Sequence, residues 1–155
     1  MPNLPVAIGA GVVALYGVAG QPVAARLDAL MAPLGVVEWL GAESHFDAVT
    51  ALSGSGPAFV ARFIEAMAAG GAALGLPEAQ AARMALATVG GTAVLLETSG
   101  EAPVAMAKRV TSPNGTTQAG LAVLDEGAVF AARVAATLDA AAQRSAELNP
   151  PAEAQ

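Results

Sequence analysis

The apolar residues near the start of the chain fall into two short runs separated by an amphipathic stretch. Residues 11–17 (GVVALYG) are apolar and bounded by glycines, which predicts a buried strand. Pro22 then opens a helix with apolar residues recurring on one face, namely Val23, Leu27, Leu30 and Leu34. Gly35 ends this helix, and residues 36–40 (VVEWL) predict a second strand. Because two lone strands do not make a domain, residues 1–41 are expected to be the incomplete edge of a larger α/β domain.

After residue 42 the apolar residues recur every three or four positions, which is the spacing of helices. The predicted helices cover residues 43–52, 57–74, 77–98, 103–108 and 117–148, with SGSG at 53–56 interrupting the first pair and a loop at 110–116. Residues 42–148 are therefore predicted to form an all-helical domain, and the proline-broken residues 149–155 a disordered tail. The expected fold class is mainly α, a helical bundle preceded by a small β-α-β unit.

The composition is unusually apolar, with 55% hydrophobic and only 13% charged residues. An average soluble chain is about 25% charged. Too few charges exist to cover a monomer, so much of the apolar surface is expected to meet another subunit. The alternative, that abundant alanine merely inflates the mean hydropathy of +0.56, stays open.

Several classes of function are disfavoured by what the sequence lacks. The net charge is −6 with no basic run, which argues against a nucleic-acid partner. The chain has no cysteine, which excludes disulfides and suits the cytoplasm. The uncharged first 25 residues are broken by prolines and glycines, so no membrane partner is expected. The single histidine, His45, is expected at a surface or interface, and no cluster of metal ligands is predicted.

Two glycine patterns could bind an anion. Residues 9–14 (GAGVVA) match the G-x-G-x-x-A dinucleotide fingerprint, but the pattern requires a following helix, and Gly17, Gly20 and Pro22 leave no room for one. We therefore interpret it as a chance match. Residues 110–117 (VTSPNGTT) form a turn leading into a helix, where free backbone N–H groups would hold a small carboxylate or phosphate. Spacing alone equally allows a simple helix cap.

Three segments together resemble signature blocks of one family, in the family's order and at its spacing. They are residues 1–5 (MPNLP), 51–58 (ALSGSGPA) and 110–117 (VTSPNGTT). Residues 47–50 and 120–127 extend the match, so that it covers nearly residues 1–148. On these residues the chain is identified as a member of the pyrroline-5-carboxylate reductase family.

The resemblance implies a Rossmann-type domain, with residues 1–41 as its C-terminal edge, and a helical dimerisation domain over residues 42–148. It implies reduction of 1-pyrroline-5-carboxylate to L-proline, the last step of proline biosynthesis, with NADPH or NADH. It also implies a homodimer, or a higher oligomer built from dimers. By the same resemblance Asn3 lies near the cofactor.

The resemblance places the substrate on the loop, at Ser112, Gly115, Thr116 and Thr117. Thr117 matches the threonine that hydrogen-bonds the ring nitrogen and is the catalytic candidate. The chain departs from the family pattern where Asn114 replaces a glycine and where Arg109 replaces an amide side chain that contacts substrate. Arg109 is thus a further substrate-binding candidate, and it leaves the native substrate geometry in doubt.

Two hypotheses about function follow. In the first, the chain is the C-terminal part of a reductase and is inactive by itself, because the dinucleotide-binding part lies outside it and no cofactor is expected to bind it alone. In the second, it is a non-catalytic dimerisation module that pairs with a full-length reductase.

Overall fold

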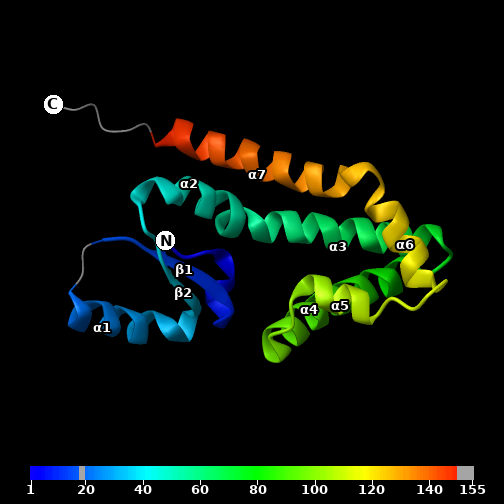
Figure 1. Cartoon of the computed structure of the whole chain (residues 1–155), viewed down its shortest axis with the longest axis horizontal. Coiled ribbons are helices and arrows are strands. Elements are labelled where there is room, and N and C mark those ends of the chain that lie inside the picture. Colours follow the sequence, from blue (N-terminus) through cyan, green and yellow to red (C-terminus); the bar gives the residue numbers. More distant parts are fainter. Residues whose placement is uncertain (18–19, 150–155) are drawn as a thin grey trace. The chain divides into compact units, whose positions relative to one another are not determined.

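The structure is a computed structural model that describes residues 1–17 and 20–149 (Figure 1). It divides into two compact units. One consists of Met1–Phe59 with residues 134–149, and the other is Val60–Arg133. Of the predicted disordered tail, every residue after Asn149 lies outside the described residues. Helices dominate the chain, so the predicted fold class, mainly α after a small β-α-β unit, is confirmed.

The first unit begins with the predicted strand–helix–strand arrangement. Strands β1 (Gly11–Leu15) and β2 (Gly35–Trp39) pair in parallel, with Gly11 opposite Gly35 and Leu15 opposite Trp39. Helix α1 (Gln21–Met31) connects them and lies beside the sheet in Figure 1. The Trp39 indole N–H donates to Asp28 Oδ1 over 2.7 Å, which ties β2 to α1. The predicted helix is shorter than expected, since a 3-10 turn, Ala32–Leu34, replaces its last turn.

A third extended segment flanks β1. The Ala14 N–H donates to the Met1 carbonyl over 2.9 Å, and the Asn3 N–H donates to the Val12 carbonyl over 3.1 Å. Pro2 accordingly forms an antiparallel bridge with Val13. The 3-10 turn Leu4–Ile8 then leads back to β1. Strand β1 is therefore paired on both edges, and its residues Val13 and Ala14 are only 3% and 1% exposed.

The glycine pattern at residues 9–14 is not a dinucleotide fingerprint. Gly9 ends the 3-10 turn in the left-handed conformation, with φ 71°. Gly11 begins a strand, whereas the fingerprint requires a helix whose N-terminus faces the pyrophosphate. The interpretation of this pattern as a chance match is confirmed.

The helical part of the first unit begins with a 3-10 turn (Glu43–His45) and the short helix α2 (Phe46–Val49). The segment at residues 53–56 was predicted to interrupt the helix, but only Ser55, where the chain bends, lies outside helical structure. The chain widens instead into a π-helical turn, Thr50–Gly54, and continues through a bend at Ser55 into α3 (Gly56–Ala73). The Ser55 N–H donates to the Thr50 carbonyl over 2.8 Å, the five-residue hydrogen bond that defines such a turn.

The start of the first unit's helical part is fixed to its C-terminal helix by a buried polar contact. The Ser145 hydroxyl, on a residue that is 6% exposed, donates to Asp47 Oδ1 over 2.7 Å. Tyr16, after β1, meets Phe46 edge-to-face with ring centroids 6.5 Å apart. These contacts join α2 both to the strand region and to the last turns of the C-terminal helix that contains Ser145.

The second unit contains most of α3, the helices α4 (Glu78–Ser99), α5 (Pro103–Arg109) and α6 (Thr116–Leu124), and the first turn of α7 (Val129–Leu148). Small residues let α3 and α4 approach closely: a Cβ on Gly71 would lie 3.3 Å from the Ala81 Cβ. The rings of Phe63 and Phe130 pack 6.3 Å apart.

The predicted single helix over residues 117–148 is wrong. Helix α6 ends at Leu124, a 3-10 turn covers Glu126–Ala128, and α7 starts at Val129. Gly127 and Ala128 adopt φ values of 59° and 55°, in the left-handed region where a helix cannot continue. The apolar spacing carried no sign of this break, because the residues on either side of it keep the helical repeat.

The isolated chain has a thin core. Among the described residues no large side chain is fully buried. The buried residues are mostly small, such as Ala51, Ala81 and Ala85, and the larger Met106 is 7% exposed. Leu124 and Val134 are each 42% exposed, and Leu74 is 90% exposed. One chain alone therefore leaves much apolar surface in contact with water.

Within the described ranges, α4 is the one helix long and apolar enough to cross a membrane, and 11% of its most apolar stretch is buried. A helix that packs against other protein can have the same composition. The expectation of no membrane partner stays a prediction.

Candidate functional site

The candidate site is the loop between α5 and α6. Helix α5 ends at Arg109 and α6 begins at Thr116, so the loop predicted at 110–116 is present with its last residue in the helix. Lys108 and Arg109 lie in the final turn of α5, where cations interact favourably with the helix dipole. The Thr111 hydroxyl donates to the Ala107 carbonyl over 2.6 Å and satisfies one of the free carbonyls there.

A tight turn forms the middle of the loop. The Gly115 N–H donates to the Ser112 carbonyl over 3.0 Å and closes a four-residue turn. Pro113 holds the second position and Asn114, with φ 58°, the third. Proline followed by a residue with positive φ defines a type II turn, which favours Gly or Asn at its third position. Asn114 is thus compatible with this turn.

Gly115 lies against the Ser112 side chain. Its backbone is extended, with φ −85° and ψ 170°, which any residue adopts. A Cβ at this position would lie 2.3 Å from the Ser112 hydroxyl oxygen, closer than non-bonded atoms approach. The glycine therefore lets the Ser112 side chain lie directly over the start of α6.

The backbone N–H groups around the turn divide into used and free donors. Asn114 donates to the Gln118 side-chain oxygen over 2.6 Å, and Gly115 donates within the turn. The first N–H bonded inside the helix is that of Ala119, which reaches the Gly115 carbonyl over 3.2 Å. In the part of the chain that the structure describes, this leaves three free N–H groups at the positive end of the helix dipole, on Thr116, Thr117 and Gln118.

Hydroxyl groups surround these free donors. Ser112 and Thr116 are exposed and Thr117 is half-buried. No hydrogen bond to another described residue occupies the hydroxyls of Ser112, Thr116 or Thr117, and Gly115 has no side chain with which to cap the helix. The loop thus brings together four of the predicted residues, Ser112, Gly115, Thr116 and Thr117, with donors free to meet a carboxylate.

Arg109 is held by an acid that the sequence analysis did not single out. Its Nη2 lies 2.8 Å from Glu101 Oε2, and its Nε lies 3.2 Å from each carboxylate oxygen. The hydrogen bonds and charge of Arg109 lower the pKa of Glu101, and the same contact raises the pKa of Arg109. Glu101 follows α4, eight positions before its partner, and no sequence repeat links the two residues. A role for Arg109 in substrate binding remains a prediction.

Asn3, the predicted cofactor residue, joins two elements of the first unit. Its side-chain oxygen accepts from the Val12 N–H over 2.8 Å, and its side-chain nitrogen donates to the Ser53 carbonyl over 3.0 Å. The amide thereby links β1 to the π-helical turn. Contact with a cofactor stays a prediction, for which one N–H and one oxygen lone pair remain.

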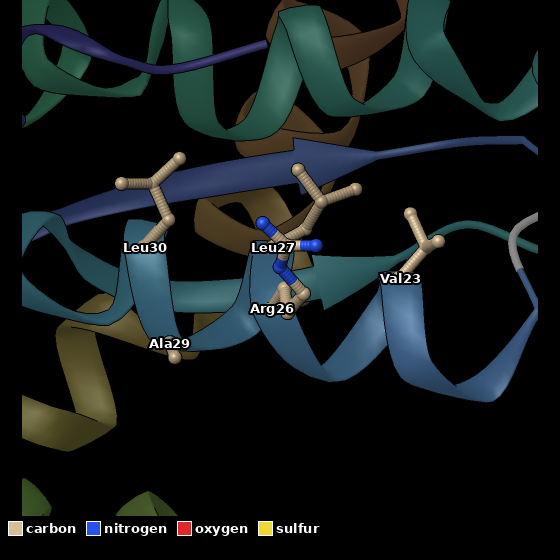
Figure 2. Close-up of a pocket in the computed structure, with 5 residues that line it drawn as sticks. All are labelled: Val23, Arg26, Leu27, Ala29 and Leu30. Carbon is tan, nitrogen blue, oxygen red and sulfur yellow. The ribbon is translucent and has the colours of Figure 1, made fainter.

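A shallow apolar depression lies elsewhere, along α1. In Figure 2 the side chains of Val23, Leu27 and Leu30 project from the same side of that helix. The depression is lined by Val23, Arg26, Leu27, Ala29 and Leu30. Arg26 supplies its only titratable group, so it offers little chemistry. The described residues contain no group of acids and His45 that could hold a metal ion.

Comparisons with known proteins agree on one family. A family model described as pyrroline-5-carboxylate reductase dimerisation matches residues 43–148. Pyrroline-5-carboxylate reductases from Synechocystis and Pisum sativum are 43% and 42% identical over 96% of this chain. The matches cover 56% and 55% of those two proteins, so the chain spans about half the length of the curated relatives.

Solved structures give the same result. A pyrroline-5-carboxylate reductase from Coxiella burnetii superposes with a TM-score of 0.91 at 31% identity, over 96% of this chain and 55% of that one. A Plasmodium falciparum pyrroline carboxylate reductase with NADP bound gives 0.78 at 26% identity, over 94% and 59%. Because the family model covers more than half of it, the chain belongs to the pyrroline-5-carboxylate reductase family.

Proposed function

We propose that this chain is the C-terminal part of a reductase that converts 1-pyrroline-5-carboxylate into L-proline with NADPH or NADH. The observation that carries the proposal is the loop between α5 and α6, where free N–H groups and hydroxyls converge. The names of the matched relatives, one of them solved with NADP, support the reaction and the cofactor.

The substrate carboxylate binds at the start of α6. Three free N–H groups, on Thr116, Thr117 and Gln118, face the position where the dipole favours an anion. The turn before them is fixed by its own hydrogen bonds, so the donors are in place before the ligand arrives. Preorganised donors need not be reordered on binding, which strengthens their effect.

Thr117 positions the ring. The reaction adds a hydride to C5 and a proton to the ring nitrogen, so that the C=N bond becomes a C–N single bond. A nicotinamide cofactor supplies the hydride when bound. A threonine hydroxyl is too weak an acid to be the ultimate proton source, so its service is to hold the nitrogen in the reacting geometry. Its free hydroxyl, beside the carboxylate-binding amides, suits that role.

The complete enzyme is a cytoplasmic homodimer, or an assembly of dimers. The matched dimerisation model supports the pairing. Because Gly9 ends the 3-10 turn Leu4–Ile8 and Gly11 begins a strand rather than a nucleotide-binding turn, we expect this chain alone to bind neither NADPH nor NADH. Titration calorimetry of the 155-residue chain with NADPH checks this, and a micromolar site would contradict it.

The function is tested in a chimera that places the Rossmann-type domain of a reductase before Met1. The chimera should reduce 1-pyrroline-5-carboxylate, and Thr117→Ala should lower its turnover by about 10²-fold or less, since one oriented hydroxyl is lost. Substrate affinity should change less, because the amides that hold the carboxylate remain. Gly115→Val should instead weaken affinity, since the added side chain collides with Ser112.

Thr98→Ala is the matched control, because its hydroxyl bonds only to the Val94 carbonyl within α4. Its turnover should equal that of the unmodified chimera. If Thr117→Ala also turns over at the unmodified rate, the hydroxyl has no catalytic role. An inactive chimera that still pairs with a full-length reductase would favour the alternative, a non-catalytic dimerisation module.

A further inference from the structure

Gln118 makes an unusual contact at the start of α6. It is the third residue of the helix, and its side-chain oxygen reaches back to accept the Asn114 N–H over 2.6 Å. In a common helix start, the capping box, the third residue accepts the N–H of the residue just before the helix, and that residue's side chain accepts an N–H in return. Here only one half of this exchange is present, and it is displaced by one residue.

The displacement has a local cause. The residue before the helix is Gly115, whose N–H is already used by the Ser112 carbonyl over 3.0 Å. The next donor along the turn is the N–H of Asn114, for which the described backbone supplies no acceptor. Gln118 therefore bonds to that group. Gly115 has no side chain to return the contact, so the N–H groups of Thr117 and Gln118 stay unfilled.

The contact also supports a backbone conformation that costs energy. Asn114 has φ 58°, a region in which asparagine is tolerated and glycine is favoured. The hydrogen bond from its own N–H fixes the peptide plane that leads into this conformation. An asparagine in place of glycine at the turn and a glutamine at position 118 thus form one structural unit in this chain.

We propose that Gln118 is a positioning residue that fixes the turn of residues 112–115 while leaving the first N–H groups of α6 open for a carboxylate. The inference rests on the proposed function for the identity of the ligand. The part of the proposal that concerns the hydrogen bond between Gln118 and the Asn114 N–H does not depend on the ligand.

Two variants separate the hydrogen bond from the charge at this position. Gln118→Met keeps the length of the side chain and its helix propensity but removes the oxygen acceptor. Gln118→Glu keeps an acceptor for the Asn114 N–H but adds a negative charge beside the free donors. Gln143→Met is the matched control, since Gln143 contacts Asp139 on α7 and has no bond to the loop.

Hydrogen exchange of the Asn114 amide, followed by NMR in the 155-residue chain, measures how strongly the hydrogen bond to Gln118 protects the turn. In Gln118→Met its protection should fall about threefold to tenfold, the effect of one lost hydrogen bond. In Gln118→Glu and Gln143→Met it should be unchanged. Unchanged protection of Asn114 in Gln118→Met would overturn the proposal.

Titration with L-proline, followed through the Thr116 and Thr117 amide signals, measures how tightly the start of α6 binds a carboxylate. Both Gln118 variants should bind L-proline more weakly, by about threefold or more, the first through a loosened turn and the second through repulsion of like charges. L-prolinamide, which lacks the carboxylate, should not shift these amides in any variant. If Gln118→Glu bound L-proline as tightly as the unmodified chain, the assigned place of the carboxylate would be wrong.

The carboxylate site and the role of Gln118 are tested separately. If L-proline shifts no loop amide even in the unmodified chain, the proposed carboxylate site fails. The exchange of Asn114 still decides whether Gln118 fixes the turn. If the exchange result fails while L-proline binds, the function stands and the role of Gln118 does not.

Discussion

At the scale of single residues, two glycines occupy their positions for different physical reasons. Gly115 has an ordinary backbone conformation, but a Cβ there would force the Ser112 hydroxyl to move. Gly35 is constrained twice. Its φ of 130° is hardly open to other residues, and a Cβ would lie 2.1 Å from the carbonyl oxygen of Gly11, its partner across the sheet.

Gly35→Ala should therefore lower the free energy of unfolding by about 2–4 kcal/mol, through backbone strain and a collision with the neighbouring strand. Urea denaturation at a fixed protein concentration measures the loss. Gly41→Ala is the control, since a Cβ there meets no atom within 4 Å, and it should change stability by less than about 0.5 kcal/mol. Equal stability of the two variants would show that β1 and β2 separate freely.

The Glu101–Arg109 pair predicts a pH dependence. Arg109 lowers the pKa of Glu101 below its ordinary value of 4.5 in the folded chain. The contribution of the pair to stability is thus fully present above the unfolded pKa of Glu101 and is lost as pH falls through its lower, folded pKa. Arg109→Gln should raise the pKa of Glu101 toward 4.5, as followed by NMR of the side-chain carboxyl. Arg144→Gln, whose partner is Glu147, should leave the titration of Glu101 unaltered.

At the scale of elements, the break between α6 and α7 shows the limit of a periodic pattern. The helical spacing of apolar residues predicts one helix, yet Gly127 and Ala128 both turn left-handed. A glycine adopts this conformation without cost, whereas alanine is strained there. The same kind of reasoning missed the π-helical turn Thr50–Gly54, where SGSG suggested an end of the helix.

Ala128→Gly should accordingly stabilise the chain by about 0.5–1 kcal/mol, since relief of the left-handed strain outweighs the extra entropy of the unfolded glycine. Ala136→Gly, in the middle of α7, should destabilise it by about 0.5–1 kcal/mol. Thermal denaturation of the two variants compares the signs directly. Destabilisation by both substitutions would mean that Ala128 is part of a regular helix in solution.

At the scale of the whole molecule, exposed apolar surface is the dominant feature. Leu86 and Val94 on α4 are 60% and 61% exposed, and Val123 on α6 is 73% exposed. The net charge of −6 is carried by few side chains, so this surface is not shielded. Monomers seldom leave large apolar patches in water, and the matched dimerisation model agrees with coverage by a second chain.

We expect the chain to be a stable dimer at micromolar concentration. Static light scattering during dilution measures the mass, and the far-UV circular dichroism of the same samples reports whether helices persist. Dissociation of the dimer and loss of helix should occur at the same protein concentration, because one chain alone buries too little apolar surface. A monomer that keeps its full helix content after dilution would contradict this expectation.

The sequence alone predicted the elements and the loop because these depend on neighbours in the chain. Apolar spacing located the β-α-β unit and the helices after residue 42, and the residues 113–117 (PNGTT) indicated a turn before a helix. The family resemblance came from the same local segments. Such patterns report which residues are buried or bent, since they act over a few positions.

Only the tertiary structure decided the contacts between distant residues and the conformations that several of them share. It brought Asn3 to Ser53, and Ser145 to Asp47. It placed Glu101 against Arg109, and directed the Gly115 N–H to a carbonyl inside the turn. It also broke the last helix at Gly127. No sequence period encodes these features, because each depends on how separate segments approach in space and on which donor is already occupied.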